Sequence, residues 1–259
     1  MGAAVVIPAR LESTRLPRKL LLAETGRPLI AHTVERVLEA QAESEGAITR
    51  VLVAADDSGL VEAARAAGAE AVMTRSDHSC GTDRIAEAAA GVPEDVIVNV
   101  QGDEPEVETS HVVTAARLLD GHDEEMGTVA YPIVSREDFM DPNLVKVVLD
   151  RQGRALYFSR APAPFPREGR ALETHSLREG EWGLAHLGIY VYRKSLLMRY
   201  AELPRSALEE REKLEQLRAL EAGEPIRVAV VSPPRGRAID AREDYDEFRR
   251  RVAAEGKIA

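Results

Sequence analysis

The stretch VLVAADDSGLVEAARAAGAEAVMT, residues 51–74, contains one complete strand, helix and strand unit. Val51–Ala55 and Ala71–Thr74 are short apolar runs bounded by polar or turn residues, which is the pattern of buried strands. Leu60–Ala67 lies between them and is rich in alanine with its charges on one side, which favours a helix. This order predicts two parallel strands joined by a crossover helix.

The same alternation continues on both sides of this unit. Two more apolar runs predict strands and two amphipathic stretches predict helices: strands Ala3–Pro8 and Val96–Val100, helices Pro28–Gln41 and Thr82–Ala90. Repeated strand and helix units predict an α/β fold. We expect an open, mostly parallel, Rossmann-like sheet with helices on both faces.

After Leu119 the rhythm of the sequence changes. Val145–Asp150 and Ala155–Arg160 read as strands, and Gln152-Gly153 between them can turn a hairpin, so antiparallel strands are expected here. Three more elements are predicted: a helix over Ser206–Leu220, a strand over Ile226–Val231 and a last helix over Arg242–Ala254. We therefore expect a single domain over residues 1–259, with a β-rich lobe inserted at roughly 128–192.

Composition and charge exclude several classes of protein. With 44% hydrophobic and 30% charged residues, the chain has the composition of a globular enzyme. The net charge of -10 repels polyanions, so no nucleic-acid partner is expected. We expect no membrane association and a cytoplasmic location, because no apolar stretch approaches the roughly 20 residues that span a bilayer and no signal-peptide pattern opens the chain. Cys80 is the only cysteine, so it has no internal disulfide partner.

A basic loop follows the first predicted strand. The stretch VVIPARLESTRLPRKLL, residues 5–21, carries Arg10, Arg15, Arg18 and Lys19. Open α/β sheets bind ligands beyond the carboxyl ends of their strands, so this loop is placed to receive an anion such as phosphate. The glycine patterns of P-loop and dinucleotide-binding proteins are absent at this turn. A merely solvated basic loop is the alternative.

Two aspartates follow predicted strands and are candidate metal ligands. Asp103, in VIVNVQGDEP (96–105), is a natural first ligand for Mg²⁺, which is often held by one or two carboxylates plus substrate phosphates. Asp240, in RAID (237–240), lies just before the last predicted helix. It would be a second ligand beside Asp103 if the strands that precede the two aspartates share a sheet. The alternatives are a turn-forming Asp103 and a helix-capping Asp240.

Taken in order, these motifs resemble the CMP-Kdo synthetases, the 3-deoxy-manno-octulosonate cytidylyltransferases. The resemblance extends from Val5 to Asp244 and rests on an ordered series: PAR…STRLP.K, AADD, MTRSDH…GT, VIVNVQGDEP, PN…VKVVLD, ALYFSRA, HLGIYVYR, LE.LEQLR and ID..ED. It implies a nucleotidyltransferase sheet, a homodimer formed through the β-rich lobe, and attack by an acceptor hydroxyl on the α-phosphorus of CTP. The expected cofactor is Mg²⁺, and the expected acceptor is a small anion, foremost Kdo.

The resemblance also assigns residues. Catalysis would fall to Arg10, Arg15, Lys19 and Asp103, and metal binding to Asp103 and Asp240. The residues expected to bind CTP are Pro8, Ala9, Arg10, Arg15, Lys19, Arg75, Ser79, Cys80, Gly81 and Gln101. Those expected to surround the acceptor are Gln101, Arg160, His186, Tyr190, Glu215 and Gln216, where Arg160 suits a carboxylate. Without the resemblance, His186 and Tyr190 would read as core residues, and Glu215 and Gln216 as the solvated side of a helix.

Departures from the family pattern leave other functions open. Arg18 stands where the family usually has glycine, Ala55 where it has threonine and Cys80 where it has serine. These changes favour, as one alternative, a cytidylyltransferase for another anion: an amino-substituted octulosonate, a nonulosonic acid or a small phosphonate. A noncatalytic nucleotide-binding protein is the alternative from another class. Cys80 is expected to pack, since this transfer needs no covalent enzyme intermediate.

Overall fold

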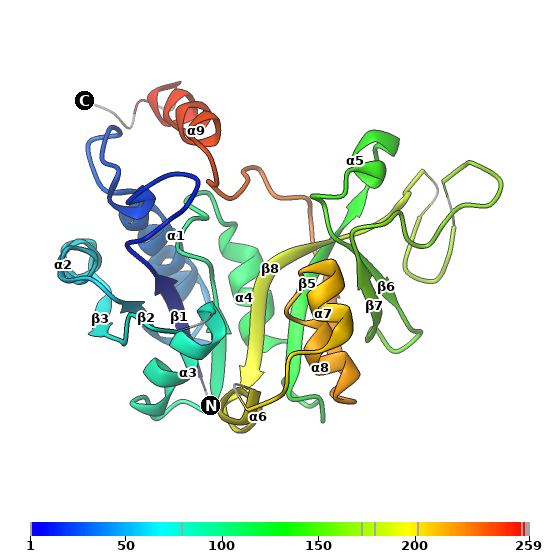
Figure 1. Cartoon of the computed structure of the whole chain (residues 1–259), viewed down its shortest axis with the longest axis horizontal. Coiled ribbons are helices and arrows are strands. Elements are labelled where there is room, and N and C mark those ends of the chain that lie inside the picture. The colour runs from blue at the N-terminus through cyan, green and yellow to red at the C-terminus, as the bar shows by residue number, and fades with distance from the viewer. Residues whose placement is uncertain are drawn as a thin grey trace. The chain divides into compact units, whose positions relative to one another are not determined.

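The computed structural model describes residues 2–78, 80–171, 173–178, 180–200, 202–254 and 256 (Figure 1). It divides into two compact units. Unit 1 comprises Met1–Ala116 with Pro234–Ala259, and unit 2 comprises Arg117–Pro233. Every helix among the described residues is too short or too polar to cross a bilayer.

Unit 1 is built on four parallel strands, labelled in Figure 1. They are β1 (Ala3–Ala9), β2 (Ile48–Ala55), β3 (Glu70–Met73) and β4 (Val96–Asn99), in the order β3-β2-β1-β4. Every residue of β1 and β4 is buried, which explains why both appear in the sequence as continuous apolar runs. The predicted parallel α/β sheet is confirmed.

Helices connect these strands and cover the sheet. They are α1 (Leu29–Glu43), α2 (Ser58–Ala66), α3 (Gly81–Ala90), α4 (Thr109–Arg117), which reaches the unit boundary, the short 3₁₀ helix η1 (Lys19–Leu21) and the last helix α9 (Arg242–Ala254). Asp57 caps α2 by accepting the backbone N–H groups of Gly59 and Leu60. Each predicted helix of this unit is present within a few residues of its expected bounds.

Unit 2 mixes antiparallel and parallel pairing. Its strands are β5 (Met126–Ile133), β6 (Lys146–Leu149), β7 (Ala155–Ser159), β8 (Gly183–Arg193) and β9 (Ile226–Val230). Strand β5 pairs antiparallel with β8 and parallel with β9, while β6 pairs antiparallel with β7 and β8. The hairpin of β6 and β7 confirms the expected antiparallel pair. The proposed lobe at 128–192 falls within this unit, and its role in dimerisation stays a prediction.

The helices of unit 2 are short. They are α5 (Arg136–Met140), α6 (Lys194–Tyr200), α7 (Ala207–Glu212) and α8 (Leu217–Glu221). The prediction of one helix over Ser206–Leu220 is wrong, because the backbone of Lys213 is left-handed, with φ 55, and ends α7. Leu214 and Leu217 are buried after this break, so the leucine spacing reflects burial of two short segments and not one continuous helix.

Candidate active site

Four charged side chains converge in unit 1, and we call them the lysine cluster: Arg15, Lys19, Asp103 and Asp240. The ammonium of Lys19 lies 2.5 Å from Asp103 Oδ2 and 3.4 Å from Asp240 Oδ1, and donates to the carbonyl of Ile239 at 2.8 Å. Arg15 Nη2 lies 2.7 Å from Asp240 Oδ1. Four residues expected to bind triphosphate and metal therefore lie together, although more than 200 positions separate the ends of this set.

Close backbone contacts place the lysine cluster. A side chain at Gly102 would bring its Cβ to 2.9 Å from the carbonyl oxygen of Pro8, so only glycine lets this turn lie against the end of β1. The N–H of Ile239 donates to the carbonyl of Asp103 at 2.8 Å, which brings Asp240 beside Asp103. Lys19 follows Arg18, whose φ of 54 is a left-handed value that glycine adopts most easily. Arg18 thus stands where the backbone itself favours the glycine usual in the family.

Asp240 does not cap the last helix. The backbone N–H groups of Asp240 and Ala241 both donate to Asp244 Oδ2, at 2.9 and 2.7 Å. Asp244 therefore satisfies two backbone donors at the start of α9, as acidic residues in a first turn often do. The carboxylate of Asp240 is left to Lys19 and Arg15.

The lysine cluster fits a divalent metal that is shared with a phosphate ligand. Asp103 and Asp240 are two hard oxygen donors that reach the same ammonium nitrogen, and their side chains keep 23% and 42% of their surface exposed. Among the described residues, no group of three or more His, Cys, Asp or Glu side chains could hold a metal by itself. Two carboxylates plus substrate oxygens is the usual arrangement for Mg²⁺ in phosphoryl chemistry.

Glu104 adds an unusual acid next to Asp103. Burial, together with the like charge of Asp103, raises the pKa of Glu104 to about 7. Protonation of Glu104 near neutral pH limits the negative charge that gathers at this turn.

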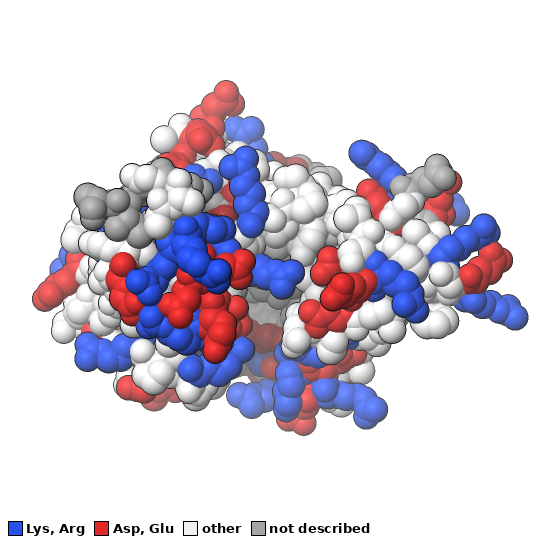
Figure 2. Space-filling model, turned by 90° about the horizontal axis from the view of Figure 1, so that it is seen from above, with Lys and Arg blue, Asp and Glu red and all other residues white. Residues whose placement is uncertain are grey.

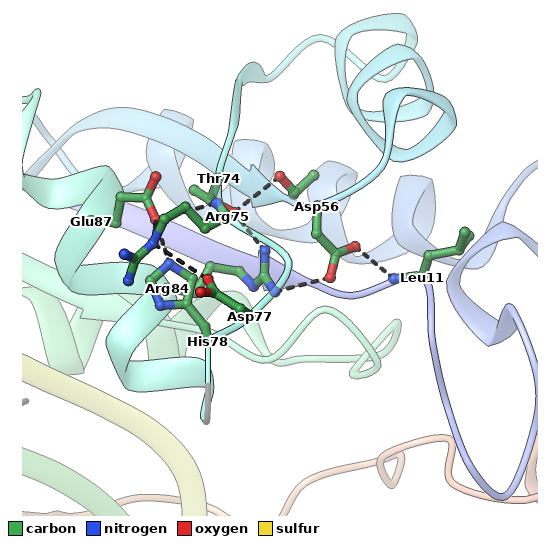
Figure 3. Close-up of polar contacts among 9 residues, drawn as sticks. Leu11, Asp56, Thr74, Arg75, Asp77, His78, Arg84 and Glu87 are labelled. Carbon is green, nitrogen blue, oxygen red and sulfur yellow. Dashed lines mark hydrogen bonds and ion pairs between the residues drawn. The ribbon is translucent and has the colours of Figure 1, made fainter.

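A second group of polar residues, which we call the arginine bracket, joins the carboxyl ends of strands in unit 1 (Figure 3). It consists of Asp56, Thr74 and Arg84. Arg84 is fully buried and donates to Asp56 Oδ2 at 2.9 Å and to Thr74 Oγ1 at 2.5 Å. The other oxygen of Asp56 accepts the backbone N–H of Leu11 at 2.9 Å. The bracket thus ties the start of the basic loop to the ends of β2 and β3.

Arg10, predicted to hold phosphate, lies next to the arginine bracket. Its Nη2 atom is buried and lacks a hydrogen-bond partner, which is costly unless a ligand completes it. Burial lowers the pKa of Arg84, Asp56 raises it, and the positive charge of Arg10 lowers it again. The guanidinium groups of Arg10 and Arg84 therefore lie near each other at the ends of the strands, and the carboxylate of Asp56 balances the charge of Arg84.

The other residues expected to bind CTP lie at the same edge of the sheet. Arg75 is exposed beside Asp77 and Glu87, and Glu87 also accepts the Arg75 backbone N–H and contacts His78 (Figure 3). Gly81 begins α3, where an added Cβ would lie 3.8 Å from Cγ of Pro8, and Cys80 is at the N-cap position without a side-chain cap bond. Gln101 donates to Asn99 Oδ1 at 3.2 Å. Ser79 lies outside the described residues, and Ala9 ends β1 fully buried.

In unit 2, Arg160 is anchored through its neighbours. Its Nε donates to the carbonyl of Glu212 at 2.7 Å and its Nη1 to the carbonyl of Pro142 at 3.0 Å. The carboxylate of Glu212 accepts the N–H of Arg160 at 2.9 Å and the hydroxyl of Ser159 at 2.8 Å. Glu212 therefore fixes both the backbone and the side chain of the residue predicted to bind the acceptor carboxylate.

The remaining acceptor-side residues also lie in unit 2. His186 and Tyr190 are half-buried neighbours on β8, with ring centroids 5.2 Å apart. Burial lowers the pKa of His186 to about 3, while burial and the charge of Glu215 raise the pKa of Tyr190. The side chain of Gln216 is buried and its Nε2 has no partner, so the solvated helix face considered for it is excluded. An unpaired buried amide is costly, so Gln216 fits a place where a ligand supplies the missing partner.

Sequence reasoning missed Asp56, Arg84 and Glu212. Arg84 could have been found from the sequence. It lies next to Ile85 in an alanine-rich helix and falls on the buried side of that helix. A charge on the apolar side of a helix must find a buried partner. The partner itself, Asp56, could not be read from spacing, since it lies in the turn after β2, 28 residues away.

A buried ion pair joins α7 and α8, the two helices on either side of Gln216. Arg218 donates to Glu209 at 2.8 and 2.6 Å, and this hydrogen bonding lowers the pKa of Glu209. A lowered folded-state pKa contributes stability above the ordinary value of 4.5, and this contribution is lost as pH falls through the lowered value. We expect Glu209→Gln to lower the free energy of unfolding by about 1.5–3 kcal/mol at neutral pH.

Denaturant titrations at neutral and acidic pH test this expectation. The difference between wild type and Glu209→Gln should shrink as the pH falls below 4.5, while glutamine keeps the capping interaction with Ser206. Glu210→Gln, at the exposed neighbouring position, serves as the control and should change nothing. A Glu209→Gln difference that is equal at both pH values would contradict the assigned role of the pair.

On the face drawn in Figure 2, Lys and Arg side chains stand among Asp and Glu side chains in several groups, with uncharged surface between the groups. Such mixing gives no continuous basic surface to the described residues on this face. It agrees with a net charge of -10 and with the expectation that only local cationic groups receive an anionic ligand.

Comparison with known proteins places these clusters in context. A family model described as cytidylyltransferase matches residues 4–226. The 3-deoxy-manno-octulosonate cytidylyltransferase of Syntrophotalea carbinolica is 47% identical over 231 residues, which are 88% of this chain and 90% of that protein. A solved structure described as CMP:2-keto-3-deoxy-manno-octonic acid synthetase complexed with CTP matches with a TM-score of 0.87 at 39% identity, covering 98% of this chain and 100% of that one.

A more distant structure shares the fold alone. A cytidylyltransferase from Leptospira borgpetersenii serovar Hardjo-bovis matches with a TM-score of 0.60 at 17% identity, covering 98% of this chain and 87% of the other. The family resemblance expected from the ordered motifs is confirmed by the closer matches.

Proposed function

The chain belongs to the cytidylyltransferase family, and we propose that it transfers CMP from CTP to a hydroxyl of the sugar acid Kdo, releasing pyrophosphate. The observation that carries this proposal is the lysine cluster, in which Lys19 and Arg15 lie against Asp103 and Asp240. Cations that contact phosphate and carboxylates that contact a metal are needed together for phosphoryl transfer. The relative that is 47% identical, named for Kdo, supports the choice of acceptor.

The proposed chemistry depends on positioning and charge. An acceptor hydroxyl attacks the α-phosphorus, and the bond to the pyrophosphate oxygen breaks. Lys19, Arg15 and Arg10 neutralise charge on the triphosphate and on the departing pyrophosphate. Asp103 and Asp240 would hold Mg²⁺, which lowers the cost of charge building up on the phosphate oxygens. The two aspartates contact Arg15 and Lys19, cations that would also contact the triphosphate.

On the acceptor side, residues of unit 2 would orient the sugar acid. Arg160 would bind its carboxylate, aided by the anchoring contacts to Glu212. Gln216 carries a buried amide donor that an acceptor oxygen would satisfy. Tyr190 and His186 supply an aromatic wall with polar atoms. These groups select a polyhydroxylated anion over an apolar acceptor.

A pyrophosphate-release assay tests the proposal. CTP and Mg²⁺ are supplied with Kdo, with amino-substituted octulosonates, with a nonulosonic acid and with small phosphonates, and each acceptor is also assayed with ATP, GTP or UTP. We expect turnover with CTP and Kdo, strong loss with other nucleotides, and complete loss when EDTA is added, reversed by excess Mg²⁺. Undiminished turnover in EDTA would contradict the metal assignment.

A cytidylyltransferase for another anion is the second candidate. The observation in its favour is Arg18, an exposed cation at a left-handed backbone position where glycine is usual. Turnover with a phosphonate and none with Kdo in the same assay would establish this candidate. Arg18→Gly is then expected to reduce that turnover, whereas it should leave a Kdo reaction unchanged.

A homodimer and a cytoplasmic location belong to the same proposal. Three large apolar side chains of unit 2 are strongly exposed, which supports an interface there: Val134, Leu156 and Phe165, at 69, 60 and 73%. Size-exclusion chromatography with light scattering should give twice the monomer mass of 28.3 kDa. A single-chain mass at working concentration would remove the dimer from the proposal.

A further inference from the structure

Thr128 and His186 face each other across an irregular part of the sheet in unit 2. Strands β5 and β8 are antiparallel, with Thr128 opposite Tyr190 and Val129 opposite Leu187. The register shift between these pairs leaves Gly188 and Ile189 as extra residues on β8, as in a β-bulge. Bulges re-aim the groups near them, and here three polar atoms of β8 gather at one hydroxyl.

The fully buried hydroxyl of Thr128 has three partners and one hydrogen. Its oxygen lies 2.7 Å from the carbonyl oxygen of Ile189, 3.2 Å from that of Leu187 and 2.9 Å from Nε2 of His186. A carbonyl oxygen can only accept, so the hydroxyl hydrogen must point to Ile189, the nearer carbonyl. The contact with His186 then requires a hydrogen on Nε2, which donates to the threonine oxygen.

This hydrogen count also fixes the protonation of Nδ1, the other ring nitrogen of His186. The ring of His186 lies between Phe158, at 5.1 Å, and Tyr190, at 5.2 Å, and burial lowers its pKa to about 3. The ring is therefore neutral at ordinary pH, and a neutral imidazole with a hydrogen on Nε2 carries a lone pair on Nδ1. No described residue donates to this Nδ1.

His32 in unit 1 provides a comparison within the same chain. Thr25 donates to the carbonyl of Arg27 at 3.0 Å and lies 2.8 Å from His32 Nε2, so the same count puts a hydrogen on Nε2. There, however, Nη2 of Arg27 lies 3.1 Å from Nδ1 and satisfies it. The two histidines share a tautomer and differ in whether Nδ1 already has a protein donor.

We propose that Thr128 is a positioning residue that locks His186 as the neutral Nε2–H tautomer, so that Nδ1 accepts a hydrogen bond from a hydroxyl of the acceptor. The inference rests on the proposed function for the identity of that acceptor. His186 orients the hydroxyl and does not take its proton, because a neutral ring of low basicity is a poor general base. The ligand recognised here is a polyol that presents an O–H donor to Nδ1.

Nitrogen-15 NMR of histidine-labelled protein tests the tautomer directly. In the wild type we expect His186 to show a protonated Nε2 and an unprotonated Nδ1, with His32 as an internal reference of the same type. His186→Gln identifies the signal. Thr128→Val removes the hydroxyl at nearly constant shape and should give a mixture of tautomers, while Thr128→Ser should restore the wild-type pattern. An Nδ1–H tautomer in the wild type, or an unchanged pattern in Thr128→Val, overturns the proposal that Thr128 fixes the tautomer of His186.

Kinetics and ligand titration test the hydroxyl contact. Thr128→Val should raise KM for Kdo by roughly tenfold with KM for CTP unchanged, and Thr128→Ser should recover most of that loss. Added Kdo should shift the Nδ1 signal of His186 and leave that of His32 in place. Turnover of Kdo without a shift at His186 overturns the contact and leaves the proposed function standing. No turnover with Kdo, together with a shift of His186 on adding another sugar acid, overturns the proposed acceptor and supports the inference.

Discussion

Asp103→Asn is expected to lower kcat by about 10²–10³-fold or more while leaving the fold intact. The carboxylate contacts Lys19 at 2.5 Å, and its proposed role is to hold Mg²⁺ on the triphosphate. Asparagine keeps the shape but cannot neutralise a divalent ion, and the loss of one well-placed electrostatic group costs about this much in rate. Pyrophosphate release at saturating CTP and Kdo measures the effect.

A matched substitution separates charge at the lysine cluster from charge in general. Asp95→Asn removes an exposed aspartate of the same unit and should leave kcat unchanged. Asp240→Asn should resemble Asp103→Asn, because both carboxylates reach the same ammonium nitrogen. Thermal unfolding should show all three variants folded. Wild-type turnover in Asp103→Asn at limiting Mg²⁺ would remove this residue from the proposed metal site.

Arg84→Met is expected to give the largest loss of stability. The guanidinium is fully buried and contacts Asp56 and Thr74, so its removal leaves the Asp56 carboxylate without its main countercharge. Breaking a buried pair on one side costs about 3–5 kcal/mol, which corresponds to a fall in Tm of roughly 10 °C in a domain of this size. The KM for CTP should also rise, roughly tenfold to a hundredfold, because the Asp56 contact to Leu11 holds the start of the basic loop beside Arg10.

Two further variants make this result specific. The double substitution Asp56→Asn with Arg84→Met removes both charges and should recover much of the stability, since paired removal leaves no isolated buried charge. The KM for CTP should remain high in the double variant. Arg65→Met, at an exposed position of α2, should change stability by less than about 0.5 kcal/mol. Equal stability of Arg84→Met and wild type would contradict the role given to the bracket.

The strands of unit 1 could be predicted because burial on both sides makes them continuous apolar runs. In β1 and β4 every residue is buried, so the pattern in the sequence is the pattern in the structure. The bounds of the helices in unit 2 were harder to predict, because the leucine spacing over 206–220 continues across Lys213, whose backbone is left-handed. A single backbone angle that a lysine seldom adopts ended the helix, and periodicity contains no information about it.

The candidate site was predictable where chemistry follows a strand. Asp103 and Lys19 lie in the loops that follow apolar runs, and the topology of open sheets indicates that residues of such loops meet. Glu212, Thr128 and Arg84 were not predicted, because each acts through a partner that is distant in the sequence, 53, 61 or 28 residues away. Their roles depend on register and on the count of hydrogens at one atom, which only coordinates provide. The bulge at Thr128 is an example.

Phosphorus NMR of a single reaction tests the central claim most directly. CTP, Mg²⁺ and Kdo are mixed with the protein, and the phosphorus signals are followed as CTP is consumed. We predict that a phosphodiester signal and the signal of pyrophosphate grow together in equal amounts, and that neither grows with Asp103→Asn. Consumption of CTP to CDP and phosphate, or a CTP spectrum that stays unchanged with Kdo and every other acceptor of the panel, would contradict cytidylyl transfer by this protein.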